Sequence, residues 1–145
     1  MRKLIAFAIL VPLALCGCDP VDRRLTLVNY SDRLIFYSVS VNDSIMGRSP
    51  LVASYEISRG DTIWDESSNL VPAGKKKSLV IIGKDAWVYY INRVCEDSTL
   101  RVFVFDKDLI TSTTWDTLVS TRRYTHKITA KVKDLEKSNW EIEIR

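Results

Sequence analysis

The sequence predicts a mainly β protein: a single β-sandwich-like domain with one or two short helices, preceded by a leader segment. Residues 34–41 alternate along the chain, with apolar side chains on one face, which is typical of a half-buried strand. Leu100–Asp106 carries apolar side chains on both faces, so this strand is expected to be buried. A length of 145 residues allows one core of this kind and no second domain.

Four further segments are expected to form strands. Each is short, rich in apolar or β-branched residues, and bounded by turn residues such as Asn29-Tyr30-Ser31-Asp32 and Pro72-Ala73-Gly74. The segments are 25–29, 51–58, 78–82 and 140–144. About seven short strands with so few helices favour two packed sheets.

Two segments have helical character. Trp87, Tyr90, Ile91 and Val94 recur at helical spacing, and Asp85 is placed to cap the start of that helix. The same stretch, 86–94, also alternates as a strand would, so both readings stay open. Residues 132–139 are rich in helix formers and predict a short helix before the last strand.

The first residues have the pattern of a secretory signal. Two basic residues are followed by an apolar run at 4–15 and then by small residues. The run is too short for a membrane-spanning helix, which needs about 20 apolar residues. We therefore expect a signal peptide at 1–17, a tether at 18–24 and a β-rich globular domain at 25–145.

Leu15-Cys16-Gly17-Cys18 resembles the bacterial lipobox, in which a leucine and a small residue precede a lipid-modified cysteine. Cys18 fits this pattern better than Cys16, because bulky Leu15 would precede Cys16 directly. The resemblance implies a diacylglyceryl group on the Cys18 sulfur and a further acyl chain, such as palmitate, on its amine. Two or three acyl chains anchor a protein firmly to a membrane. The alternative is a soluble secreted protein with paired cysteines.

Removal of residues 1–17 would leave 19 basic and 18 acidic residues. This balance gives no reason to expect a nucleic-acid partner. Cys95 would remain as a single thiol, and its apolar neighbours predict that it is buried. Asp19 and Asp22 follow the lipobox closely. An aspartate there resembles an inner-membrane retention signal in some bacteria and a surface-export signal in Bacteroidota, so outward and periplasm-facing locations both stay open.

Few residues carry recognisable chemistry. His126 is the only histidine, so we expect no metal site and no cofactor, and a solvated strand position for its side chain. Asp106 and Asp108 follow the strongest strand, where we expect them to cap or bond the backbone at a turn rather than to act as a glycosidase pair. A small hydrolase that uses these three residues is the least favoured function.

Aromatic residues suggest a second function class. Trp64 and Asp65 lie in an acidic stretch, which favours an exposed indole on which a sugar could stack. With Asp106 and Asp108 they form a candidate glycan-binding set. The other tryptophans are expected in the core, and the Lys75-Lys76-Lys77 run is expected to be a solvated turn that protects the following strand.

The mature chain resembles a family of small Bacteroidota lipoproteins that has no assigned activity. The segments that carry the resemblance are Asn29-Tyr30-Ser31-Asp32, Arg101-Val102-Phe103-Val104-Phe105-Asp106, Trp115-Asp116-Thr117-Leu118, Arg123-Tyr124, Asp134-Leu135 and Asn139-Trp140. The resemblance implies an outer-membrane host setting and no reaction. We therefore expect a lipid-anchored, non-enzymatic binding or structural accessory domain, with the membrane as one partner and a glycan or an envelope protein as another.

Overall fold

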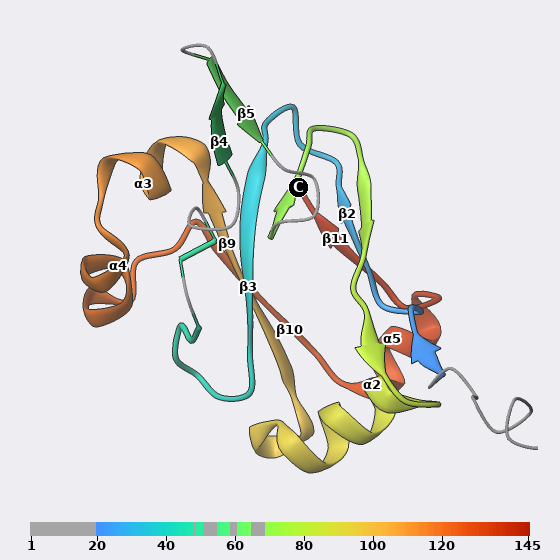
Figure 1. Ribbon diagram of the computed structural model, residues 1–145. Helices are drawn as coiled ribbons and strands as arrows, with labels where there is room; N and C mark the ends of the chain where they lie inside the picture. The colour runs from blue at the N-terminus through green and yellow to red at the C-terminus, as the bar shows by residue number, and fades with distance from the viewer. Residues whose placement is uncertain (1–19, 48, 51–54, 59–60, 65–68) are drawn as a thin grey trace, which may run out of the picture.

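The computed structural model describes residues 20–47, 49–50, 55–58, 61–64 and 69–145, and it confirms a β-rich domain (Figure 1). A four-stranded sheet has the order β10-β9-β3-β6, and a three-stranded sheet has the order β11-β2-β7. Two short ribbons, β1-β8 and β4-β5, stand beside them. The strands are β1 (Val21–Asp22), β2 (Thr26–Asn29), β3 (Ile35–Ser40), β4 (Tyr55–Ser58), β5 (Asp61–Trp64), β6 (Leu70–Val71), β7 (Lys76–Ser78), β8 (Ile81–Ile82), β9 (Leu100–Asp106), β10 (His126–Ala130) and β11 (Glu141–Ile144).

Both faces of the four-stranded sheet are buried. Ile35 and Tyr37 of β3 belong to the core between the two sheets, whereas Phe36 belongs to a second core on the opposite face. Strand β9 divides in the same way, with its valines in the first core and Phe103 and Phe105 in the second. The burial of β9 is confirmed. The expectation that 34–41 is only half-buried is wrong, because a helical layer covers the second face.

The helical layer consists of α3 (Lys107–Ser112) and α4 (Trp115–Thr121), which the sequence did not lead us to expect. They lie beside β9 and β3, on the side away from the three-stranded sheet (Figure 1). Ile110 and Leu118 are their buried residues and pack on Phe36, Phe103 and Phe105. Thr114 caps α4 by accepting a hydrogen bond from the Thr117 amide.

The expected strand at 78–82 is divided into two shorter strands with different partners. Strand β7 pairs antiparallel with β2, while β8 pairs antiparallel with β1. The two strands therefore belong to different sheets. Strand β1 lies within the expected tether, so the folded part extends to within three residues of Cys18.

The segment 86–94 is helical, which settles the alternative in favour of helix. Helix α2 (Ala86–Tyr89) continues into a π-helical turn (Tyr90–Val94), which a 3-10 turn (Glu96–Ser98) follows. The expected cap is wrong: Asp85 has a φ of 52° and makes no side-chain capping bond. The Trp87 amide instead donates to Oδ2 of Asp22, from β1. Asp22, 65 positions before Trp87, thus accepts the amide hydrogen bond that Asp85 was expected to accept.

Four smaller expectations are also confirmed. The helix before the last strand is present as α5 (Val132–Lys137), and Ile142 and Ile144 point inward from β11. Cys95 is buried, as expected. Trp87 is buried, while Trp115 and Trp140 are partly buried against the two cores, which confirms core packing for these three. Within the described residues, no helix is long and apolar enough to cross a membrane.

Candidate functional site

The residues expected to carry function are only partly described. Cys18 and Asp65 lie outside the described residues, as do positions 51–54 of the expected strand 51–58. Trp64 ends β5, where the register sets it opposite Tyr55 of β4. The backbone of this ribbon extends beyond the two sheets (Figure 1). The candidate glycan-binding set therefore stays a prediction.

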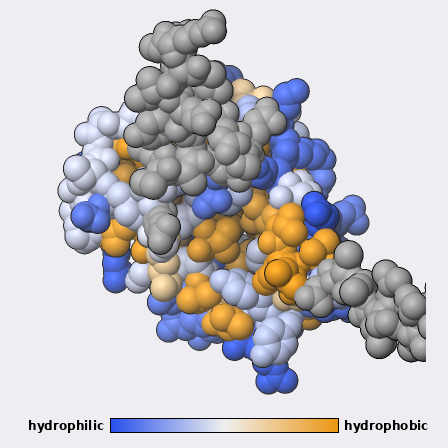
Figure 2. Space-filling view, in the orientation of Figure 1, coloured by the Kyte–Doolittle hydropathy of each residue, from blue (hydrophilic) through white to orange (hydrophobic). Residues whose placement is uncertain are grey.

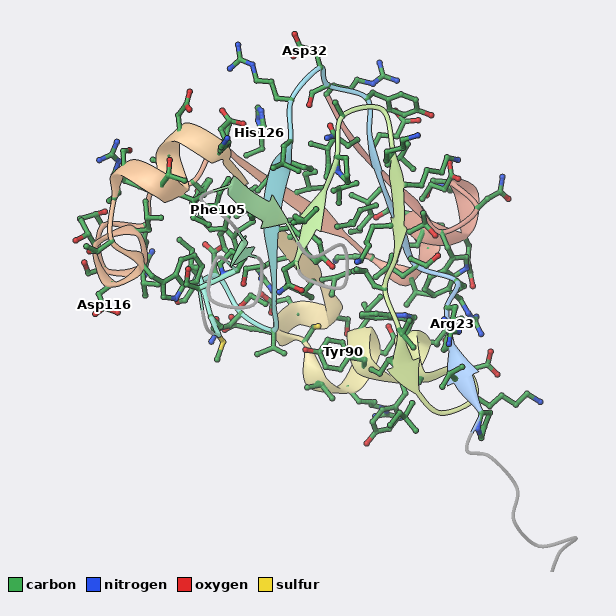
Figure 3. All side chains as sticks on the ribbon, turned by 45° about the horizontal axis from the view of Figure 1, so that its top comes forward. Arg23, Asp32, Tyr90, Phe105, Asp116 and His126 are labelled. Carbon is green, nitrogen blue, oxygen red and sulfur yellow. The ribbon has the colours of Figure 1, made fainter. Side chains whose placement is uncertain are left out.

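Asp106 and His126 lie in one small hollow of about 200 Å³. Asp32, Arg33, Thr125 and Arg145 also line it, and the Asp106 amide donates to Oγ1 of Thr125 at 2.9 Å. Figure 3 shows His126 and Asp32 at the same end of the molecule. His126 is exposed on β10, as expected for a solvated strand histidine.

Asp108 lies apart from this hollow, in the first turn of α3. Asp106 is the residue before that helix and makes no side-chain capping bond, so the expected backbone-bonded turn is replaced by a helix start. No hydrogen bond or ion pair between the side chains of Asp106 and His126 is found among the described residues. Within the same residues, no three potential metal ligands cluster.

A larger hollow of about 570 Å³ lies between the edges of the two sheets. We call it the β3–β7 groove. Its lining comes from β3, from β7 and the residues that follow it, and from two loops and α2: Tyr37, Ser38, Val39, Met46, Gly47, Asn69, Lys77, Ser78, Leu79, Val80 and Trp87. Figure 2 shows apolar surface in this central region. The groove combines apolar walls with a few polar groups, as ligand sites do.

The groove is open because β6 is short. Strand β6 pairs only with Ile35 and Phe36, and the Tyr37 amide donates one more bond, to the Asn69 carbonyl at 3.0 Å. Successive residues of a strand direct their main-chain groups to opposite sides. Val39 therefore directs its N–H and C=O away from β9, as Tyr37 does, and no described strand pairs with it there. Within the part of the chain that the structure describes, this edge of β3 therefore has no paired strand at Val39.

Tyr37 adds a buried hydroxyl to the groove. The residue is 4% exposed, and its hydroxyl makes no hydrogen bond with any part of the chain that the structure describes. Burial raises the pKa of this phenol from 10.0 to about 12. A buried polar atom without a partner is costly in free energy. A ligand that supplies an acceptor or donor in the groove would remove that cost.

Sequence reasoning missed the groove. The alternation of 34–41 did place Tyr37 on an apolar face, but a tyrosine there is most simply a core residue. The opposite wall of the groove depends on the division of 78–82 into two strands. The local sequence gives no sign of this division. Cys95 lies outside the groove lining, and burial raises the pKa of its thiol, which disfavours a nucleophilic role.

No family model, curated protein or solved structure matches this chain.

Proposed function

We propose that the protein is a lipid-anchored lipoprotein of the cell envelope and acts as a non-enzymatic binding module. Residues 1–17 would be removed and Cys18 would carry the lipid, as the lipobox resemblance implies. The domain that follows begins three residues later with β1, so it would be held close to the membrane. The resemblance to small Bacteroidota lipoproteins favours the outer membrane and an outward-facing domain, with a periplasm-facing domain as the alternative.

Asp22 bears on the choice of membrane face. Its side chain is only 3% exposed and is bonded to Trp87 and Arg24. A sorting factor that reads the folded protein cannot reach this carboxylate. Of the two acidic residues near the lipobox, Asp19 is therefore the one that a sorting system would read. A protease that cannot enter intact cells would distinguish the two faces.

The ligand that best fits the β3–β7 groove is an extended segment of an envelope protein. No described strand pairs with the N–H and C=O of Val39. These groups can pair with the main chain of such a segment, in the manner of strand addition to a sheet edge. The groove beside this edge holds the unpartnered Tyr37 hydroxyl and the apolar side chains of Met46 and Val80. The observation that carries the proposal is this edge, unpaired among the described residues, beside a hollow of about 570 Å³.

Replacement of Cys18 by alanine tests the anchor. Cys18→Ala should release the protein from the membrane fraction, because the variant lacks the sulfur that takes the diacylglyceryl group. Cys16→Ala is the matched control and should stay in the membrane fraction, since Cys16 would be removed with the signal. Fractionation and metabolic labelling with palmitate measure both. Membrane retention of Cys18→Ala with continued labelling would contradict the assignment of the anchor to this residue.

Replacement of Tyr37 by phenylalanine tests the groove. In the free protein, Tyr37→Phe removes a buried hydroxyl that has no partner among the described residues, and it should raise the free energy of unfolding by about 1 kcal/mol. Extended peptides selected for binding to the purified protein should bind the variant about tenfold more weakly, because they lose one hydrogen bond. Urea denaturation and titration of tryptophan fluorescence, to which Trp87 in the groove lining contributes, measure the two effects.

The pH dependence of stability provides a control for this variant. The folded protein holds the Tyr37 proton up to a pKa of about 12, whereas the unfolded chain releases it near 10.0. The free energy of unfolding should therefore fall as pH rises through this window, because only the folded state binds the proton there. Tyr37→Phe should lack this part of the decrease. A variant that is less stable than wild type, or equal affinity of the two proteins for every selected peptide, would contradict the proposed role of the groove.

Glycan binding at the β4-β5 ribbon is the second candidate. Its support is the register that sets Trp64 opposite Tyr55, two residue types whose rings stack on sugars. Two variants distinguish glycan binding at this ribbon from peptide binding in the groove. Glycan binding would be lost in Trp64→Ala and retained in Tyr37→Phe. A hydrolase at Asp106 and His126 has the least support, since their shared hollow holds no hydrogen bond between these two side chains in the described structure.

A further inference from the structure

The β1-β8 ribbon presents an apolar face to solvent. Val21 and Ile82 are directly paired across it and are 46% and 72% exposed. Val80, two residues before Ile82, is also exposed, as is Tyr89 on α2, the helix that contacts both strands of the ribbon. We call these four residues the anchor-side patch. Surface strands usually direct polar residues outward, so an apolar outer face indicates that something covers it.

The opposite face of the ribbon fixes its orientation. Asp22 and Ile81 are the second cross-strand pair, and Asp22 is buried. Its carboxylate accepts hydrogen bonds from the Trp87 amide at 3.1 Å and from Nε of Arg24 at 2.9 Å. The ribbon therefore cannot turn over to bury Val21 and Ile82 without breaking these bonds. The exposure of the patch is a consequence of this arrangement.

The patch lies where the chain leaves the domain toward Cys18. Val21 is both a patch residue and the first residue of β1, three positions after Cys18. An extended chain covers at most about 3.5 Å per residue, so Val21, at the edge of the patch, lies within about 10 Å of the modified cysteine. Figure 2 shows apolar surface next to the point where the N-terminal segment joins the domain.

Residues suited to a membrane interface surround the patch. Tyr89 has an amphipathic ring of the kind enriched at the boundary between lipid and water. Arg23 directly follows β1, Lys84 lies two residues after β8, and both side chains are exposed. Their positive charges are suited to binding lipid phosphates. The nearby carboxylate of Asp85 is paired with Arg24, which limits its repulsion of phosphates.

We propose that the anchor-side patch rests on the phospholipid bilayer and orients the domain on the membrane. The inference depends on the proposed lipid at Cys18, which brings the patch to the bilayer surface. Helices α3 and α4, on the opposite side of the fold, would face away from the membrane (Figure 1). The β3–β7 groove shares Val80 with the patch, so it would open close to the lipid surface.

Site-directed fluorescence in vesicles tests this orientation. The full lipidated protein, carrying Ile82→Cys labelled with an environment-sensitive dye, is reconstituted in vesicles of phosphatidylethanolamine and phosphatidylglycerol that contain nitroxide lipids. The label should react only at the introduced cysteine, because the Cys18 sulfur carries lipid and Cys95 is buried. Asp116→Cys is the matched control, exposed on α4 and far from Arg23 of the β1 region in Figure 3. We expect the lipid quencher to remove most of the emission at position 82 and none at position 116.

The other outcomes separate the patch from the anchor. If the protein floats with the vesicles but neither position is quenched, the patch does not contact lipid and the inference is overturned, while the anchor stands. If position 82 is unquenched and crosslinks to a second copy, the patch is a protein interface, which also overturns the inference. If the protein does not float, the anchor itself fails and this inference fails with it.

Discussion

Phe105→Ala is expected to lower the free energy of unfolding by about 3–5 kcal/mol, the usual cost of removing a buried phenylalanine. Phe105 is 0% exposed on β9, and its ring lies 5.4 Å from that of Trp115, measured between centroids. It joins the four-stranded sheet to α4, so its loss leaves a cavity between two layers. A domain of ordinary stability has about 5–15 kcal/mol in total. The variant should therefore be marginal or unfolded.

Urea denaturation followed by circular dichroism would measure this loss. Phe105→Leu is the matched control, because it keeps most of the apolar volume and should cost less than about 1.5 kcal/mol. Near-equal stability of Phe105→Ala and wild type would show that the second core does not hold α3 and α4 to the sheet.

Asp22→Ala is expected to lower the free energy of unfolding by about 2–3 kcal/mol, since it leaves a buried amide without its charged acceptor. The carboxylate is 3% exposed and holds the Trp87 amide at 3.1 Å. Its removal should loosen β1 from α2 and thereby free the end of the domain nearest Cys18. Hydrogen exchange at the Trp87 amide should rise markedly.

Asp85→Ala is the matched control for this change. Asp85 is at the position where the sequence predicted a cap, yet its side chain is 58% exposed and, among the described residues, bonds Arg24 alone. Exposed ion pairs contribute little to stability, so this variant should resemble wild type. A larger loss for Asp85→Ala than for Asp22→Ala would mean that the local residue caps α2 after all.

The sequence by itself determined the β-rich class, the strongest strands and the burial of Cys95. Strand β9 was predictable because its apolar residues occupy both faces of a strand, a pattern that is visible in the local sequence. Helix α5 was likewise predictable from a run of helix formers. The prediction of lipid at Cys18 also comes from the sequence alone, because a leader and its cysteine are read as a linear motif.

The tertiary structure decided the features that depend on distant residues. Asp22 replaces Asp85 at the start of α2 because β1 brings it there from 65 positions away. Helices α3 and α4 are short, and their burial against Phe103 and Phe105 rather than their own propensity accounts for them. The groove exists because β6 pairs with two residues of β3, which leaves Val39 at an edge that has no paired strand among the described residues. Strand pairing is a contact between remote segments, so the local pattern of 34–41 could not reveal where that edge would be.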